Sequence, residues 1–282
     1  MEHSLPESVP EKTQSKYLNL KKYIRSLGSL AVGFSGGVDS CLLLTAAREE
    51  LGEKAIAVTA VNAAMPLREQ DEAKAFCGSR GIRQIICHFD PMQIESFRHN
   101  GPDRCYDCKR GIFTEIYKIA RQNGITYVAE GSNMDDLGDY RPGLRAVKDL
   151  GVKSPLREAE LYKSEIRALA RALDLPVWSK PSYACLASRF VYGEEITAEK
   201  LHMVELAEQF LIEKGFAEER VRIHGNIARI EVPPKDITRL AADGIREEIW
   251  QEFKKIGFMF TALDLHGYQT GSMNATIGAA PE

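Results

Sequence analysis

The sequence predicts an α/β fold, in which a parallel, doubly wound sheet is followed by a smaller α+β domain. Short apolar runs alternate with helical stretches that stop at glycines, a pattern typical of βαβ units. A turn rich in serine and glycine separates one of these strands from the next helix. From Thr197 onward the pattern changes to two strands between helices, without a further glycine-rich loop.

The elements of the first domain follow from apolar spacing and glycine stops. Tyr17–Leu27 has apolar residues at helical spacing and stops at Gly28, so it predicts a helix. The apolar runs short enough for buried strands are Ser29–Phe34, Ala55–Ala60, Arg83–Cys87 and Thr126–Ala129. Further helices are predicted at Val38–Leu51, Leu67–Ser79, Ile112–Gln122 and Lys163–Leu173. Ligands of such sheets bind outside the carboxyl ends of the strands, where Ser35–Gly37 and Glu130–Asn133 lie.

The second domain is predicted from a new order of elements. Before it, Ser179–Tyr192 has no clear period and contains Cys185 and Arg189, so we interpret it as a functional loop rather than a linker. A helix, two strands, a helix and a strand are then predicted at Ala198–Lys214, Val221–Ile223, Ala228–Val232, Asp236–Ile256 and Phe258–Leu265. The predicted division is a flexible tail (1–14), an α/β domain (15–194), an α+β domain (195–275) and a second tail (276–282).

Composition narrows the class of protein. The 282 residues are 44% apolar and 27% charged, which is typical of a globular chain, and the net charge is -3. A general nucleic-acid binder is usually basic, so we expect no nucleic-acid partner. The longest mostly apolar stretch, Ala55–Met65, is far shorter than the roughly 20 residues of a membrane span, and no export signal is visible. We therefore expect a cytoplasmic protein without a membrane partner, whose six cysteines are reduced, metal-bound or catalytic.

The sharpest motif is Ser35-Gly36-Gly37-Val38-Asp39-Ser40, between a predicted strand and a predicted helix. The two glycines allow a tight turn that brings N–H groups close to an anion, and the helix N-terminus adds positive charge. The hydroxyls of Ser35 and Ser40 can donate to phosphate oxygens, and Asp39 suits either the Mg²⁺ that accompanies a polyphosphate or the backbone of the loop. No Gly-Lys-Ser/Thr follows, so this is not a Walker A loop. It resembles the pyrophosphate loop, or PP-loop, of ATP pyrophosphatases, which cleave ATP between the α and β phosphates.

The cysteines form a second group of candidates. Cys105-Tyr106-Asp107-Cys108 is a C-x-x-C motif, and Cys185 stands apart from it. By itself the motif suits a redox pair, half of a zinc site or part of an iron–sulfur site. The second C-x-x-C or H-x-x-x-H that completes the usual zinc site is absent from the sequence. Three cysteines would leave one iron of a 4Fe–4S cluster without a protein ligand. The other cysteines are explained as small buried hydrophobic residues: Cys41, Cys77 and Cys87.

Together these motifs closely resemble the LarE family over one continuous order from about residue 15 to 275. The motifs that carry the resemblance are Ser35–Ser40, Asp103-Arg104-Cys105-Tyr106-Asp107-Cys108-Lys109, Glu130-Gly131-Ser132-Asn133-Met134-Asp135-Asp136, Asp139-Tyr140-Arg141-Pro142-Gly143 and Ala184-Cys185-Leu186-Ala187-Ser188-Arg189-Phe190. The PP-loop alone would identify only the superfamily, and the later motifs narrow it to this family.

The resemblance implies an ATP-dependent sulfurtransferase. Its substrate is a pyridinium biscarboxylic acid mononucleotide, whose carboxylates are adenylated and then attacked by sulfur, in the biosynthesis of the nickel-pincer nucleotide cofactor of lactate racemase. Some members give up the sulfur of one cysteine at the position of Cys185. Others hold a 4Fe–4S cluster on three cysteines, and the presence of Cys105, Cys108 and Cys185 together resembles this second type. The resemblance also implies a homo-oligomer, with sulfide from a donor that the sequence does not identify.

Roles for individual residues follow from the same resemblance. ATP and Mg²⁺ are assigned to the PP-loop, the nucleoside to Gly131 and Asn133, and catalysis to Ser35, Asp39 and Cys185. The substrate phosphate is assigned to Arg220 and Arg222, which are two apart on a predicted strand and so point the same way. The alternative for this pair is two solvated charges at a strand end. Glu231 is a candidate to orient the two arginines. Contacts with metal or phosphate, or purely structural roles, remain open for Asp136, Arg141 and Arg189.

Three other functions fit parts of the sequence. A tRNA thiolase of the same superfamily would share the PP-loop, but the net charge of -3 and the lack of a basic domain count against it. An ammonia-using synthetase, such as an NAD or GMP synthetase, would need no cysteine near the loop. A nucleotide-binding regulatory protein would bind ATP without forming AMP.

Overall fold

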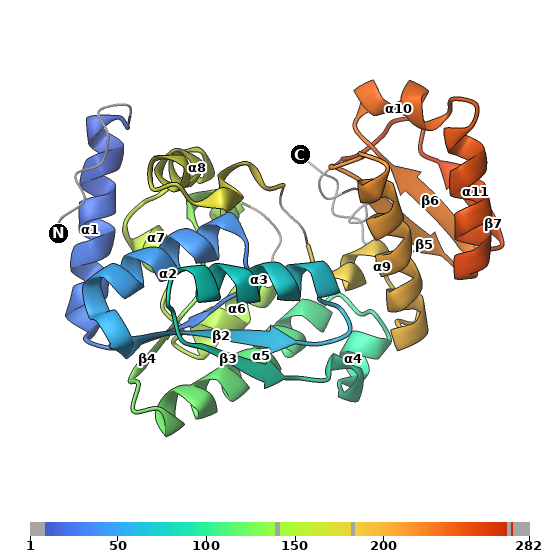
Figure 1. Cartoon of the computed structure of the whole chain (residues 1–282). Coiled ribbons are helices and arrows are strands. Elements are labelled where there is room, and N and C mark those ends of the chain that lie inside the picture. The colour runs from blue at the N-terminus through green and yellow to red at the C-terminus, as the bar shows by residue number, and fades with distance from the viewer. Residues whose placement is uncertain (1–8, 139–141, 182–183, 270–271, 273–282) are drawn as a thin grey trace. The chain divides into compact units, whose positions relative to one another are not determined.

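The computed structural model describes residues 9–138, 142–181, 184–269 and 272 (Figure 1). The chain divides into two units by its internal contacts. The first unit comprises Met1–Asn62, Leu67–Phe89 and Cys105–Ser182. The second comprises Ala63–Pro66, Asp90–Arg104 and Tyr183–Glu282. The domain boundary predicted after residue 194 stays a prediction. Within the described ranges, every helix is too short or too polar to cross a bilayer.

The first unit contains the predicted parallel sheet, with strand order β3-β2-β1-β4. The strands are β1 (Leu30–Gly33), β2 (Ala55–Val61), β3 (Gln84–His88) and β4 (Tyr127–Ala129). Consecutive residues of the central strand face opposite layers of side chains. Leu30 and Val32 of β1 belong to one apolar core, whereas Ala31 between them belongs to the other. Both faces are therefore covered, as a doubly wound sheet requires.

Helices cover the two faces of this sheet (Figure 1). One core contains residues of α1 (Glu11–Leu27), α2 (Val38–Leu51), α3 (Leu67–Ser79), α7 (Pro155–Glu158) and α8 (Lys163–Ala172). The other core contains residues of α5 (Arg104–Gln122) and α6 (Pro142–Asp149). The predicted doubly wound α/β fold is confirmed.

Two helices of the first unit begin earlier than predicted. Helix α1 begins at Glu11 directly after Pro10, so residues 11–14 of the predicted tail are helical, and the side chain of Thr13 is buried. Helix α5 begins at Arg104 rather than at Ile112. Its first turns are polar, so apolar periodicity did not reveal them. The C-x-x-C motif is consequently helical.

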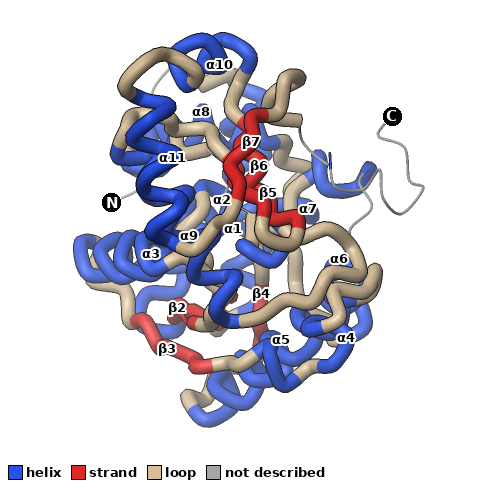
Figure 2. Tube along the Cα trace, turned by 90° about the vertical axis from the view of Figure 1, so that its right-hand side faces the viewer, coloured by secondary structure: helices blue, strands red, loops and turns tan. Residues whose placement is uncertain are grey.

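The second unit contains a three-stranded sheet of order β5-β6-β7 (Figure 2). Strands β5 (Arg220–His224) and β6 (Ile227–Glu231) are antiparallel, and β7 (Phe260–Leu263) lies parallel to β6. The helices of this unit are α4 (Glu95–Arg98), α9 (Ala198–Glu213), α10 (Pro234–Leu240) and α11 (Ile245–Ile256). The single helix predicted over Asp236–Ile256 is wrong, because the chain breaks at Gly244, whose φ of 86° is left-handed.

Candidate active site

The PP-loop joins β1 to α2 at the carboxyl edge of the parallel sheet. Gly36 adopts a left-handed φ of 74°, and a Cβ there would lie 3.3 Å from the Cβ of Ala73 on α3. The left-handed conformation therefore favours glycine at this position, and a side chain would also crowd Ala73. Gly37 is the N-cap residue of α2, and no side chain caps the helix. The first-turn N–H groups of α2 are thus available to an anion.

The two serines of the loop converge. The hydroxyl oxygens of Ser35 and Ser40 lie 3.3 Å apart, and Ser40 Oγ also donates to the carbonyl of Gly37 at 3.0 Å. Ser40 is buried, whereas Ser35 is exposed. This arrangement stiffens the loop across the two glycines. Ser35 is the serine that is more accessible to a ligand.

Asp39, on the first turn of α2, is bound through both carboxylate oxygens. Its Oδ1 accepts a hydrogen bond from Asn133 Nδ2 at 3.1 Å. Its Oδ2 accepts one from Lys163 Nζ at the start of α8. The structure thus brings together two residues that the sequence singled out and one that it did not. Lys163 is 124 positions from Asp39, and no local spacing connects the two.

The chain after β4 packs tightly against the start of α2. A Cβ on Gly131 would lie 3.1 Å from the backbone N of Ser40 and 3.2 Å from Asp39 Cβ, so a larger residue would push the two segments apart. Asn133 is oriented in turn by its own backbone N–H, which donates to Asp136 Oδ2 at 2.9 Å. Asp136 therefore makes a structural contact, which is one of the roles that the sequence left open for it.

Glu130 is a buried carboxylate beside this segment. It accepts hydrogen bonds from Ser132 Oγ and Ser154 Oγ, both at 2.7 Å. These two hydroxyl donors offset the free-energy cost of burying the carboxylate. We infer that Glu130 shapes the end of β4 rather than binding a ligand directly.

The C-x-x-C motif lies within the first two turns of α5. Cys105 is exposed and Cys108 is half-buried, and residues three apart on a helix share a face. Cys185 is exposed and belongs to the second unit, just before the 3-10 turn Leu186–Arg189. In the portion of the chain that the structure describes, no three His, Cys, Asp or Glu side chains form a group suited to a metal ion. The ligand roles of the three cysteines stay predictions.

The second unit holds a buried cluster of arginines and glutamates. Arg220 and Arg222 on β5 are both buried, which differs from the alternative of solvated charges. Arg222 Nε donates to Glu231 Oε2 at 2.9 Å, so Glu231 does orient one of the pair. The guanidinium of Arg220 lies over the ring of Tyr268, with 4.9 Å to the ring centre. Arg229 also pairs with Glu231, at 3.0 Å.

Arg189 is almost completely buried, with 1% of its surface exposed. Its Nε and Nη2 donate to the two carboxylate oxygens of Glu208 at 2.8 and 2.9 Å. Its Nη1 donates to the carbonyl oxygens of Ala184 at 2.9 Å and Cys185 at 3.4 Å. Burial alone would raise the pKa of the Glu208 carboxyl, but the Arg189 guanidinium holds it below the usual value. Arg189 therefore supports the backbone that carries Cys185.

Comparisons with known proteins identify the family. The search found no matching family model. An uncharacterized protein of Synechocystis is 40% identical over 264 residues, covering 94% of this chain and 98% of the relative. The pyridinium-3,5-bisthiocarboxylic acid mononucleotide synthase of Lactiplantibacillus plantarum is 33% identical over 267 residues, covering 94% of this chain and 96% of the relative. The chain belongs to the LarE family.

A more distant relative places this LarE family member in a wider group. A glutamine-hydrolyzing GMP synthase component of Archaeoglobus fulgidus is 27% identical over 206 residues, covering 66% of this chain and 65% of the relative. This match agrees with the PP-loop fold described above. The predicted resemblance to LarE and the predicted superfamily are both confirmed.

The remaining cysteines of this LarE family member are structural. Cys41, Cys77 and Cys87 are buried, as the sequence predicted. Burial raises the pKa of the Cys77 thiol to about 12 and also raises the pKa of the other two. Such thiols are poor nucleophiles and metal ligands at neutral pH.

Of the residues whose roles the sequence left open, Arg141 lies outside the described residues.

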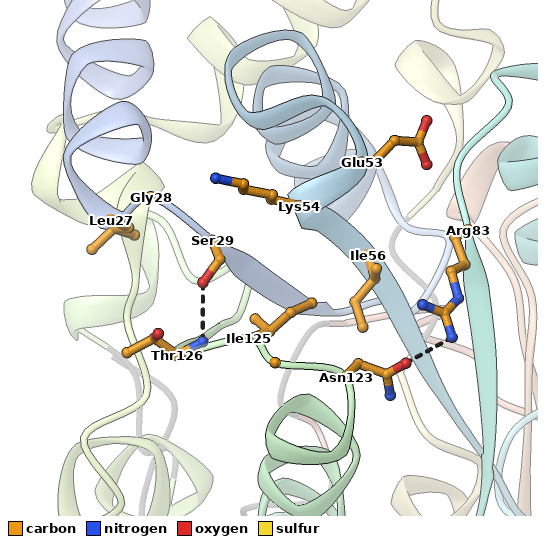
Figure 3. A pocket seen from close by; sticks show the side chains of 11 residues that line it. Leu27, Gly28, Ser29, Glu53, Lys54, Ile56, Arg83, Asn123, Ile125 and Thr126 are labelled. Atoms are coloured by element: carbon orange, nitrogen blue, oxygen red, sulfur yellow. Dashed lines mark hydrogen bonds between the residues drawn. The ribbon is translucent and has the colours of Figure 1, made fainter.

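A hollow of about 340 Å³ opens at the opposite, amino edge of the same sheet (Figure 3). Apart from Ile56, its lining residues precede the strands, and two pairs of its polar groups bind each other. Thr126 N donates to Ser29 Oγ at 3.0 Å, and Arg83 Nη2 donates to Asn123 Oδ1 at 2.7 Å. Parallel sheets bind ligands at their carboxyl edge. The candidate site therefore stays at the PP-loop.

Proposed function

We propose that the protein transfers sulfur to the carboxylates of pyridinium biscarboxylic acid mononucleotide, and cleaves ATP to AMP and pyrophosphate to do so. The product would serve the biosynthesis of the nickel-pincer nucleotide cofactor. One observation supports the proposal most strongly. The PP-loop places an uncapped helix N-terminus and the Asp39 carboxylate at the same edge of the sheet. It does so in a chain that is related along 94% of its length to a synthase of this product class.

The PP-loop residues would bind ATP and its metal. The N–H groups at the start of α2 and the hydroxyls of Ser35 and Ser40 would hold the phosphates. Asp39 offers the oxygen ligands that Mg²⁺ prefers, and Asn133 keeps its carboxylate oriented. When bound, Mg²⁺ would neutralise charge on the phosphates and on the leaving pyrophosphate. Gly131 would keep the chain that carries Asn133 close to the loop, because a side chain there would push the two segments apart.

The reaction would proceed in two steps. A carboxylate oxygen of the substrate attacks the α-phosphorus, the bond to the β-phosphate oxygen breaks, and pyrophosphate leaves. Sulfide sulfur then attacks the acyl carbon, the bond to the AMP oxygen breaks, and a thiocarboxylate remains. Adenylation is needed because a free carboxylate is a poor electrophile. The loop N–H groups would stabilise the charge that develops on the phosphates.

Arg220 and Arg222 would hold the phosphate of the mononucleotide. Both are buried, and arginine binds phosphate through paired hydrogen bonds. Glu231 fixes Arg222 in one orientation, which reduces the entropy lost on binding. Replacing either arginine with alanine should weaken substrate binding by about 1.5–3 kcal/mol, while affinity for ATP stays nearly unchanged.

Cys105, Cys108 and Cys185 would hold a 4Fe–4S cluster. The donor set fits, because Cys105 and Cys108 lie three apart on one helix face, and Cys105 and Cys185 are exposed while Cys108 is half-buried. When bound, the cluster would supply sulfide for the second step. Arg189 would hold the backbone of the Cys185 loop in place through the carbonyls of Ala184 and Cys185.

Product analysis tests the ATP chemistry. Purified protein, ATP, Mg²⁺, sulfide and the pyridinium substrate should yield AMP and pyrophosphate, and Asp39→Asn should abolish both. ADP and orthophosphate as first products would refute the proposal. AMP formed on transfer RNA instead of the mononucleotide would favour a tRNA thiolase.

A second experiment tests the source of sulfur. Protein purified without oxygen should contain iron and sulfide, and Cys105→Ala should remove the cluster absorption and repeated turnover. Cys87→Ala, at a buried cysteine, is the matched control. If Cys185 instead loses the elements of H₂S after one turnover, and Cys105→Ala still completes that turnover, Cys185 is a sacrificial donor.

A further inference from the structure

Lys163 makes the closest contact to the key carboxylate of the PP-loop. Its ammonium donates to Asp39 Oδ2, while Asn133 occupies Oδ1. The side chains of Lys163 and Asp39 are 29% and 21% exposed, so the pair sits at the surface of the site rather than in the core. Exposed or partly exposed ion pairs contribute only about 0–1 kcal/mol to stability. Stability alone therefore gives a weak reason for a lysine here.

The base of this lysine is fixed while its ammonium can move. The backbone N–H of Lys163 donates to Asp135 Oδ2 at 2.6 Å. Beside it, Tyr162 N donates to Glu165 Oε2 at 2.9 Å, and Glu165 is held by Lys16 Nζ at 2.7 Å. These bonds anchor the first turn of α8. The flexible four-carbon stem then lets the charge swing around one fixed point.

The Lys163 ammonium has more N–H donors than Asp39 can accept from. A lysine has three N–H donors, and Asp39 is the acceptor for one of them. For the other two, no acceptor exists among the residues that the structure describes. They lie beside a helix N-terminus and a glycine loop, a combination that attracts polyphosphate. Mg²⁺ neutralises only part of the charge of a triphosphate, so the remaining negative charge can bind a nearby ammonium.

We propose that Lys163 binds the β and γ phosphates of ATP, the part that leaves as pyrophosphate, and shares the Asp39 carboxylate with the metal. This proposal rests on the proposed function, because it assigns a residue to the same nucleotide site. A carboxylate oxygen has more than one lone pair, so Asp39 can serve both cations. Lys163 would then stabilise the charge that grows on the leaving group.

Binding measurements test this proposal without relying on activity. Titration calorimetry compares Mg-ATP, Mg-pyrophosphate and AMP as ligands of the wild type, Lys163→Met and Lys163→Arg. Losing a charged hydrogen bond should weaken Mg-ATP and Mg-pyrophosphate about ten- to hundredfold in Lys163→Met. AMP, which lacks the two terminal phosphates, should bind nearly as before. Lys163→Arg keeps the charge and should recover most of the affinity.

Lys118→Met removes a lysine of the same unit whose ion pair with Glu115 is exposed, and it should change no affinity. Thermal melting of each variant shows whether it is folded. Equal losses for AMP and ATP, or no loss for ATP, would overturn the proposal. Pyrophosphate binding in EDTA gives a further check: a loss that appears only with Mg²⁺ would mean that Lys163 acts through Asp39 alone.

The proposed function and this inference can fail separately. ADP as the product of ATP cleavage would refute the pyrophosphatase chemistry. The contrast between pyrophosphate and AMP binding would still decide whether Lys163 contacts the terminal phosphates.

Discussion

Removing one partner of the buried Arg189–Glu208 pair should strongly destabilise the protein. The pair has two hydrogen bonds, at 2.8 and 2.9 Å, and Glu208 Oε1 also accepts the backbone N–H of Val221 at 3.0 Å. Glu208→Leu would leave a guanidinium with 1% exposure without its carboxylate. An unpaired buried charge costs about 3–5 kcal/mol. At roughly 2–4 °C per kcal/mol for a chain of this size, the melting temperature should fall by about 6–20 °C.

The double variant separates the cost of an unpaired charge from the value of the pair. Replacing a buried ion pair with apolar side chains of similar volume is often nearly neutral. Arg189→Met combined with Glu208→Leu should therefore recover most of the stability that either single change loses. Urea unfolding of the wild type, both single variants and the double variant gives the coupling free energy. A single variant that loses less than about 1 kcal/mol, or a double variant that loses the sum of both, would refute the reasoning.

The same variants test the role of Arg189 beside Cys185. The double variant should be folded, yet it lacks the donors to the carbonyls of Ala184 and Cys185. We therefore expect faster alkylation of Cys185 by iodoacetamide than in the wild type. An unchanged rate in a stable double variant would mean that Arg189 does not position the Cys185 loop.

Four further outcomes follow from the structure. Gly36→Ala forces a side chain into a left-handed conformation and should cost about 1–2 kcal/mol in urea unfolding, so an unchanged midpoint would contradict the strain. Gly131→Ala should weaken Mg-ATP binding in calorimetry more than it lowers the melting temperature, because the crowded atoms belong to the PP-loop. At pH 8, mass spectrometry should find iodoacetamide on the exposed Cys105 of cluster-free protein. Cys77, whose pKa burial raises to about 12, should react only after unfolding. The pKa of Glu208 is lower in the folded than in the unfolded state, so its stabilisation is present above about pH 4.3 and is lost as the pH falls further. Melting temperature against pH should show this loss in the wild type and not in Glu208→Leu.

The architecture of the first unit and the place of its nucleotide loop could be predicted from the sequence alone. Helices at Val38–Leu51 and Leu67–Ser79 were predicted with the bounds that the structure has, because apolar spacing and terminal glycines are local signals. The PP-loop was readable for the same reason, since its residues are consecutive. Signals of this kind fail where the helix is polar, as at the start of α5, or where one glycine breaks a periodic stretch, as at Gly244.

The distant residues that complete the site became visible only when the elements were packed together. Lys163 meets Asp39 across 124 positions, and Glu208 meets Arg189 because α9 packs beside the 3-10 turn that carries it. Neither partner stands out in the sequence, because a lysine at a helix start and a glutamate within a helix are common on solvated surfaces. Burial distinguishes Arg220, Arg222 and Glu231 from ordinary strand-end charges, and Arg222 pairs with Glu231. Whether a charge is solvated or buried depends on the packing of elements far apart in the chain, and periodicity along the sequence does not contain that information.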